Sequence, residues 1–419
     1  MKVRHALTAL TGAALLTVLP VSPVAAQQTP QPLPSDQKGC LGAPQGSDHG
    51  KPWAQRQLAP DQVWSLTTGS GITVGVIDSG VDGASPQLAG GRVLPGVDVT
   101  APGGTANTDC YGHGTFVAGI IAAATDPGTG FAGIAPSVTI LPIRAAKPGT
   151  DGAAPVLSAD SLADGIRAAV DAGARVLNVS ASTTVAEPKL AAAVQYAADH
   201  DVVLVASAAN GKQQGDPVTY PAAYPGVIAV GAIDEQGQLA DFSQTGPFIS
   251  LVAPGVGVES VGPGGAGQWQ GTGTSYSAPF VTGTAALVRA YHPDLSAAQV
   301  KHRLEATADH PAKAALPDPG VGWGTVNVVA AVTRLLPEES GAAAKMVKPP
   351  PMGAAPAAEA AGNGPALAAG SVLLAVFLAV GLVVFLRFAR GGRARNWAPP
   401  RTVRVEPEPP AATPKGRVG

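Results

Sequence analysis

The sequence is poor in charged and aromatic residues. Of its 419 residues, 13% are charged and 5% are aromatic, and the formal net charge is −2. So small a net charge gives no reason to expect a nucleic-acid partner. Gly (53 residues) and Pro (40 residues) are abundant, and the length allows one large domain with appendages.

Cysteine is rarer still, since Cys40 and Cys110 are the only two. The N-terminus, described below, indicates export to an oxidising setting, where one disulfide is the simplest interpretation. This bridge would tie the N-terminal arm to the loop just before His113. The alternative is a pair of free thiols.

The sequence also lacks a compact run of alternating carboxylates. Asp98, Asp109 and Asp126 are the acidic side chains that could suggest calcium. They do not follow the close alternation of a calcium-binding loop. We therefore assign no metal and no cofactor.

One serine stands out in the segment 271–279, Gly-Thr-Gly-Thr-Ser-Tyr-Ser-Ala-Pro. The two glycines permit a tight backbone, and residues 278–291 are expected to form a helix with Pro279 in its first turn. Unpaired N–H groups at a helix N-terminus can stabilise an oxyanion. Ser275 is therefore a candidate nucleophile, although most serines in such loops form turns or caps.

An acid and a histidine each stand at the end of an expected element. Residues 72–78 read as an apolar, buried strand that ends in Asp78, and His113 opens an apolar pattern of helical period. Functional sites of α/β proteins collect at the carboxyl edge of the parallel sheet. Asp78, His113 and Ser275 can thus converge on one edge of one sheet.

The three stretches resemble those of the subtilisin-like serine proteases, the subtilases. They read Asp78-Ser-Gly-Val, His113-Gly-Thr-Phe-Val-Ala-Gly and Gly273-Thr-Ser-Tyr-Ser-Ala-Pro, and the resemblance covers roughly residues 53–335. It implies a three-layer α/β domain with a mostly parallel central sheet and helices on both faces. It also implies that Ser275 is the nucleophile, that His113 is the general base and then acid, and that Asp78 orients the imidazole.

A fourth stretch, residues 202–211, resembles the family's oxyanion segment. Asn210 would hold the oxyanion together with the N–H of Ser275. The alternative for Asn210 is a plain Asn-Gly turn.

Two departures from the family pattern concern the pocket for the residue before the scissile bond. Ala209 stands where the family usually has Gly. The strand 176–182 lacks the family's Gly after its substrate-pairing residues, Ser180 and Ala181. The added methyl groups would make the pocket shallower, so we expect a preference for small side chains.

Strands and helices alternate through the middle of the chain, which predicts a parallel sheet with right-handed crossovers. A segment rich in Gly, Pro and Ala, 147–159, is expected to be a mobile loop. The expected helices are 162–172 and 190–198, and the expected strands are 138–143, 174–179, 202–206, 227–232 and 249–252.

The N-terminus has the pattern of a secretory signal over residues 1–26: a basic start, an apolar stretch and small residues before the expected cleavage point. The alternative is a membrane anchor, for which the apolar run is too short. Residues 27–60 are expected to form an extended arm, because they are too few for a separate pro-domain core. A short helix at 59–64 would lead into the protease domain, 61–336.

Composition changes at Pro337. Residues 337–366 are rich in Pro, Ala and Gly, as in a linker. Residues 367–386 form an uncharged apolar run of the length of one transmembrane helix. The basic tail, 387–419, would stay in the cytoplasm by the positive-inside rule, which leaves the protease domain outside a cell membrane that the chain crosses once.

This plan resembles that of the mycosins, the membrane-anchored subtilisin-like proteases of type VII secretion systems. The resemblance implies a serine endopeptidase that cleaves exported proteins through an acyl-enzyme, associates with the secretion membrane complex, and has an N-terminal arm wrapped around the protease domain. The alternative is a structural component that stabilises such a complex, with protease activity secondary.

Overall fold

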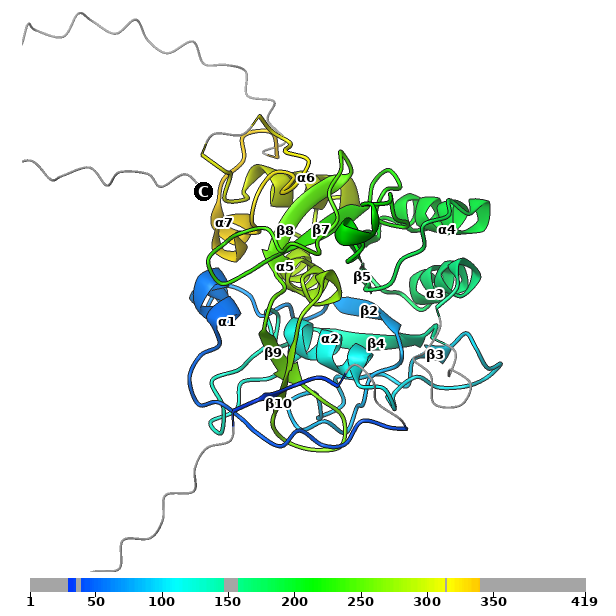
Figure 1. Ribbon diagram of the computed structural model, residues 1–419, viewed down its shortest axis with the longest axis vertical. Helices are drawn as coiled ribbons and strands as arrows, with labels where there is room; N and C mark the ends of the chain where they lie inside the picture. The colour runs from blue at the N-terminus through cyan, green and yellow to red at the C-terminus, as the bar shows by residue number, and fades with distance from the viewer. Residues whose placement is uncertain (1–28, 35–38, 147–156, 313–314, 340–419) are drawn as a thin grey trace, which may run out of the picture. The chain divides into compact units, whose positions relative to one another are not determined.

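Strand β2 (Thr73–Asp78) lies inside a seven-stranded sheet of order β3-β4-β2-β5-β6-β7-β8 (Figure 1). Every neighbouring pair in this sheet is parallel. The predicted α/β fold with a parallel central sheet is thus confirmed. The other strands are β3 (Val97–Asp98), β4 (Thr139–Arg144), β5 (Val176–Val179), β6 (Val203–Ser207), β7 (Ile228–Ile233) and β8 (Ile249–Pro254).

The computed structural model describes residues 29–34, 39–146, 157–312 and 315–339. The described residues all belong to one compact unit. No helix within the described ranges is long and apolar enough to cross a membrane. Several predicted segments lie wholly or mostly outside these ranges: the signal peptide, the linker, the transmembrane helix, the basic tail and the loop 147–159.

Helices cover both faces of the sheet (Figure 1). Successive side chains of a strand point to opposite faces, so Val74 and Val76 of β2 join one hydrophobic cluster and Ile77 joins another. The first cluster contains residues of α2 and α5, and the second contains residues of α3 and α4. These helices are α2 (His113–Ala122), α3 (Ala159–Asp171), α4 (Pro188–Asp199) and α5 (Ala278–Tyr291).

The predicted loop 147–159 extends too far at its C-terminal end, where α3 has already begun. Ser158 caps α3, because its side chain accepts a hydrogen bond from the Ser161 N–H at 3.1 Å. The helix therefore begins at Ala159. The other helices and strands predicted in the middle of the chain are present, with ends displaced by no more than three residues.

The predicted arm, 27–60, is not extended throughout. Residues Trp53–Leu58 form helix α1, and Ala54 and Leu58 are buried in the core of the domain. The short helix expected at 59–64 is the 3₁₀ turn η1 (Pro60–Val63). Elements that were not predicted include β9 (Val258–Val261), β10 (Gln268–Gly271), α6 (Ala297–Ala306) and α7 (Val328–Thr333).

The first part of the arm lies along a second, three-stranded sheet. Strands β9 and β10 pair antiparallel, and β1 (Gln31–Pro32) adds parallel to β10. The Leu33 N–H continues this pairing by donating to Gln270 O at 2.8 Å. The arm is thus held to the protease domain by backbone hydrogen bonds.

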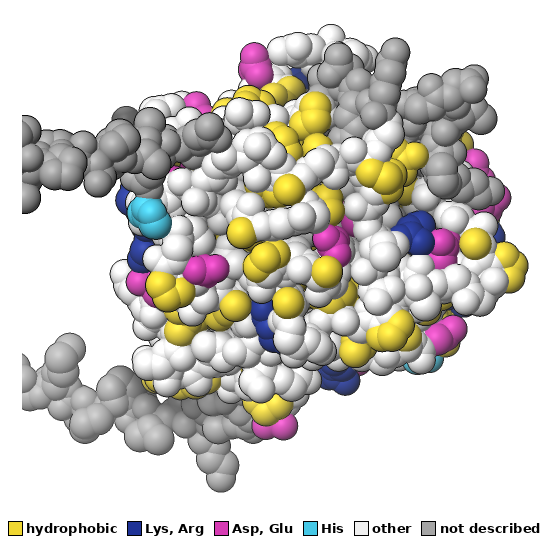
Figure 2. Space-filling model, turned by 90° about the horizontal axis from the view of Figure 1, so that it is seen from below, with side chains coloured by type: hydrophobic (Ala, Val, Ile, Leu, Met, Phe, Trp, Pro, Cys, Tyr) yellow, Lys and Arg dark blue, Asp and Glu magenta, His cyan; other side chains and the backbone are white. Residues whose placement is uncertain are grey.

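Figure 2 shows one face of the molecule, where hydrophobic side chains are scattered among polar atoms and charged groups are few. Scattered apolar side chains are usual on soluble domains and mark no binding site by themselves. The large hydrophobic side chains exposed in the described ranges are Leu66, Val185, Val218, Tyr291 and Leu335.

Candidate active site

Three of the predicted site residues stand at element termini along the carboxyl edge of the sheet. Asp78 ends β2, His113 begins α2, and Ser275 lies in the 3₁₀ turn η4 (Thr274–Tyr276) just before α5. The turn η4 packs against α2 and β6. The ring centroids of Tyr276 and His113 are 5.2 Å apart, so the chain neighbour of Ser275 contacts the histidine directly.

The histidine is held by the aspartate. His113 Nδ1 lies 2.8 Å from Asp78 Oδ1 and 2.9 Å from Asp78 Oδ2. A carboxylate partner requires a proton on Nδ1, which leaves Nε2 as the basic nitrogen. The Asp78 side chain is 5% exposed and the His113 side chain 31%, so the acid is buried and the imidazole reaches the surface.

The charged surroundings of His113 favour its protonated form. Burial alone would lower the pKa of the imidazole, but the charge of Asp78, its hydrogen bond and the charge of Asp109 outweigh that effect. The pKa of His113 is therefore raised above its usual 6.5. Such an imidazole can accept a proton from a hydroxyl and return it to a leaving group.

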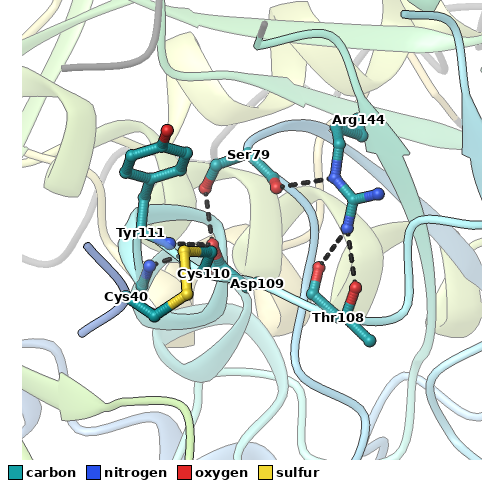
Figure 3. Close-up of a disulfide and its surroundings, with 8 residues drawn as sticks. Cys40, Ser79, Thr108, Asp109, Cys110, Tyr111 and Arg144 are labelled. Carbon is teal, nitrogen blue, oxygen red and sulfur yellow. Dashed lines mark hydrogen bonds between the residues drawn. A yellow bond between two sulfur atoms is a disulfide. The ribbon is translucent and has the colours of Figure 1, made fainter. Parts of the chain in front are cut away.

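Asp109, which was considered only as a calcium candidate, is a second buried carboxylate, in the loop just before α2 (Figure 3). Its Oδ2 accepts from the N–H and hydroxyl of Thr115, and its Oδ1 accepts from the Tyr111 and Gly112 N–H groups. Ser79 Oγ donates to Asp109 Oδ1 at 2.9 Å. Asp109 thus caps the start of α2, and burial raises the pKa of its carboxyl although the Thr115 and Gly112 bonds oppose the rise.

Arg144, at the end of β4, fixes the loop that carries Asp109 (Figure 3). Its guanidinium donates to Ser79 O at 3.1 Å and to Thr108 Oγ1 at 2.9 Å. It also forms an ion pair with Asp98 Oδ2 at 2.9 Å. The Arg144 side chain therefore ties together the segment after β2, the loop that carries Asp109, and β3.

The predicted disulfide between Cys40 and Cys110 is present in the structure. It joins the N-terminal arm to the residue immediately after Asp109 (Figure 3). The Leu41 N–H adds a 2.7 Å hydrogen bond to Cys110 O. The arm is thus covalently attached three residues before His113.

Ser275 is held by a chain of polar contacts that sequence reasoning missed. Ser180 Oγ donates to Ser275 O at 2.8 Å, and Asn178 Nδ2 donates to Ser180 Oγ at 2.8 Å. Thr282 Oγ1 of α5 donates to Asn178 Oδ1 at 2.9 Å. Both Asn178 and Thr282 are fully buried. The available signal was one Asn inside an otherwise apolar strand.

Asn210 lies next to Ser275 in the structure. Asn210 Oδ1 accepts from the Thr274 N–H and hydroxyl, both at 2.9 Å, which identifies the other amide atom as the Nδ2 donor. A Cβ built on Gly273 would lie 3.2 Å from Asn210 Nδ2 and 3.4 Å from Ser275 Oγ. The nitrogen and the hydroxyl therefore face one small space, which only a glycine at 273 leaves open.

The predicted pocket residues occupy the two neighbouring strand ends. Ser180 and Ala181 follow β5, and Ala209 follows β6, which pairs with β5. Ala209 has φ of +79°, in the left-handed region that costs an L-residue with a Cβ roughly 1–2 kcal/mol. Because this position has Ala where the family usually has Gly, its backbone is strained.

The three carboxylates weighed as calcium ligands have different partners. Asp98 pairs with Arg144, Asp109 accepts from protein N–H and O–H groups, and Asp126 Oδ1 accepts from the Gly128 N–H at 2.7 Å. Within the described part of the chain, no group of three or more His, Cys, Asp or Glu side chains is placed to hold a metal ion.

Comparisons with known proteins agree with this fold. The profile of the subtilase family, peptidase S8, matches residues 69–324. Mycosin-4 of Mycobacterium tuberculosis (strain ATCC 25618 / H37Rv) is 40% identical over an alignment of 331 residues that covers 70% of this chain and 71% of that protein.

Similar solved structures include two from secretion systems. The MycP3 protease from the type VII (ESX-3) secretion system has 35% identity and a TM-score of 0.62, covering 73% of this chain and 95% of that one. A chain of an intact ESX-5 inner membrane complex has 32% identity and a TM-score of 0.61, covering 86% of this chain and 97% of that one. The protein belongs to the subtilase family of serine proteases and, within that family, to the mycosins.

Proposed function

We propose that Asp78, His113 and Ser275 form the catalytic triad of this protease. Ser275 Oγ attacks the scissile carbonyl carbon while His113 Nε2 takes the hydroxyl proton. The tetrahedral intermediate then expels the amine, which receives that proton from the imidazolium, and leaves an acyl ester on Ser275. Water activated by the same imidazole hydrolyses the ester. The observation that carries the proposal is the double contact of His113 Nδ1 with the buried Asp78 carboxylate.

Asn210 Nδ2 and the Ser275 N–H would hold the oxyanion of both tetrahedral intermediates. The support is the position of Asn210 Nδ2, which faces the same small space as Ser275 Oγ. A preorganised donor of this kind typically contributes about 10²–10³ in turnover.

The pocket bounded by Ser180, Ala181 and Ala209 would accept small side chains. The support is the Cβ of Ala209 at a position that favours glycine. Cleavage of a peptide library should enrich small residues immediately before the cut. Enrichment of large aromatic residues there would contradict this specificity.

We propose further that the protein acts on exported proteins within a type VII secretion complex. The support is the similarity, over most of its length, to the MycP3 protease from the type VII (ESX-3) secretion system and to a chain of the ESX-5 inner membrane complex. In this proposal residues 1–26 direct export and 27–60 form the arm. The protease domain, 61–336, is then tethered outside the membrane through the linker 337–366, the span 367–386 and a cytoplasmic tail.

A structural role in the complex is the second candidate, favoured by the similarity to a chain of an assembled membrane complex. A strain lacking the gene, supplied with either the wild type or Ser275→Ala, separates the two roles. Loss of substrate cleavage with secretion intact in the variant would assign chemistry to Ser275 and a scaffold role to the domain. Unchanged substrate cleavage in Ser275→Ala would refute the proposed nucleophile.

A further inference from the structure

Gln244 is a buried polar side chain in the connection between β7 and β8, with 1% of its surface exposed. It lies against the loop after β6 that carries Asn210. Its backbone N–H donates to Ala209 O at 3.1 Å. Its side-chain Oε1 accepts from the Gly211 N–H at 3.2 Å. One residue therefore binds the backbone on both sides of Asn210.

The other half of the Gln244 amide is also engaged, because Nε2 donates to Pro217 O. A side chain at this place needs an acceptor toward Gly211 and a donor toward Pro217, and it must remain neutral while buried. A glutamine amide meets all three conditions. Glutamate lacks the donor, and methionine has neither a donor nor a comparable acceptor.

The segment bound by Gln244 has a strained backbone. Ala209 has φ of +79°, a region that side chains with a Cβ rarely adopt. Asn210 itself is exposed, and its side chain reaches Thr274 through Oδ1. The direction of Asn210 Nδ2 thus depends on two anchors, Thr274 on the side chain and Gln244 on the flanking backbone.

We propose that Gln244 is a positioning residue that aims the Asn210 amide at the developing oxyanion. This inference rests on the oxyanion role proposed above for Asn210. Gln244 does not touch the reacting atoms and acts through the Ala209–Gly211 backbone. Without its side-chain bonds, the strained loop relaxes and Nδ2 moves away from its target, although the fold persists.

Other contacts should keep a Gln244 variant folded. The Lys212 N–H donates to Phe242 O at 3.3 Å, and the Thr245 N–H donates to Asp216 Oδ1 at 2.9 Å. These bonds attach the same loop to the same connection without Gln244. The expected defect is therefore local.

The test is the second-order rate at which the purified full-length chain is labelled by a fluorophosphonate, whose phosphonyl oxygen occupies the oxyanion position. Gln244→Met should reduce this rate about 10- to 100-fold, as expected for misplacement of a catalytic group by roughly 1 Å. Asn210→Ala should reduce it by about 10²–10³. The double variant should react no more slowly than Asn210→Ala alone, because Gln244 acts only through Asn210.

Gln55→Met is the matched control, since Gln55 is 3% exposed and its amide donates to Ala132 O, outside the site. It should lower thermal stability as Gln244→Met does, with an unchanged labelling rate. Gln244→Asn, whose shorter amide cannot span both contacts, is the second variant in case Gln244→Met does not fold. It should show the same loss of rate.

Two results would overturn this inference alone while the wild type is labelled. One is a normal rate in folded Gln244→Met or Gln244→Asn. The other is a multiplicative loss in the double variant, which would show that Gln244 acts by another route. If Asn210→Ala reacts as fast as the wild type, the oxyanion proposal fails and this inference fails with it. A wild type that is not labelled at all contradicts the proposed triad instead.

Discussion

At the scale of single residues, the site depends on hydrogen-bond partners that are distant in sequence. Asp78, His113 and Ser275 were predicted as candidates because they lie at or just before expected elements and because their motifs resemble those of the subtilases. The hydrogen bonds of Asp109 and Gln244 were not predicted, because the partners of a buried polar side chain come near it only when the chain folds. Ser180 was predicted as a pocket residue, but it also binds Ser275 O.

The acid limb of the pH profile should respond to Asp109. His113 must be neutral to take the Ser275 proton, so the reaction slows as the pH falls through the pKa of His113. The charge of Asp109 is one cause that raises this pKa. Asp109→Asn should therefore move the acid limb to lower pH, measured as the pH dependence of the fluorophosphonate labelling rate. A limb that stays in place or moves to higher pH would show that Asp109 has no electrostatic effect on the imidazole.

Gly273→Ala should reduce activity with the fold retained. The added Cβ would lie 3.2 Å from Asn210 Nδ2, and the backbone φ is +150°, so both the oxyanion space and the η4 turn are disturbed. The expected loss is about 10²-fold or more in labelling rate. Gly237→Ala is the control, because Gly237 also has positive φ but has open space around it, and this variant should keep the wild-type rate. Equal labelling rates for Gly273→Ala and the wild type would mean that the oxyanion does not occupy this space.

At the scale of elements, periodicity located the long strands of the parallel sheet and its crossover helices, but it missed short elements that form only through contacts with distant parts of the chain. Strand β1 forms only by adding to β10, whose residues are more than 200 positions away. Helix α1 is only six residues long, too short for a helical period to be distinguished from a loop. The arm was therefore predicted as extended over its whole length, although its last part is helical and buried.

Breaking the disulfide should destabilise the domain. The bridge closes a loop with a sequence separation of 70 residues, for which chain entropy gives an upper value of about 4 kcal/mol. Cys40→Ser should lower the thermal midpoint of the full-length chain, and Cys110→Ser should lower it similarly. The double variant should be no worse than either single one, since both remove the same bond. A thermal midpoint equal to that of the wild type would show that the arm is held without the bridge.

At the scale of the whole molecule, packing of the arm places carboxylates close together across separate parts of the chain. Burial, together with the charge of Asp48 in the arm, raises the pKa of Glu259 on β9 to about 7. Its ordinary value, 4.5, applies in the unfolded chain. Between these two values the folded state binds more protons, so the free energy of unfolding decreases as the pH rises through this window.

Glu259→Gln should therefore stabilise the protein above pH 7 and have little effect near pH 5. After partial solvent screening is allowed for, the gain is about 1 kcal/mol, or roughly 2–4 °C in the thermal midpoint. Thermal unfolding of the wild type and the variant at pH 5 and pH 8 measures the difference. A larger increase in the thermal midpoint at pH 5 than at pH 8 would contradict the predicted pH dependence.

The most direct test of the central claim is to locate the site of reaction. The full-length protein is treated with a fluorophosphonate and digested, and the adduct is mapped by mass spectrometry, with Ser275→Ala and His113→Ala treated in parallel. The account predicts a single adduct, on Ser275, that is absent from Ser275→Ala and forms far more slowly in His113→Ala. An adduct on another serine, or equal labelling of Ser275 without His113, would contradict the proposed triad.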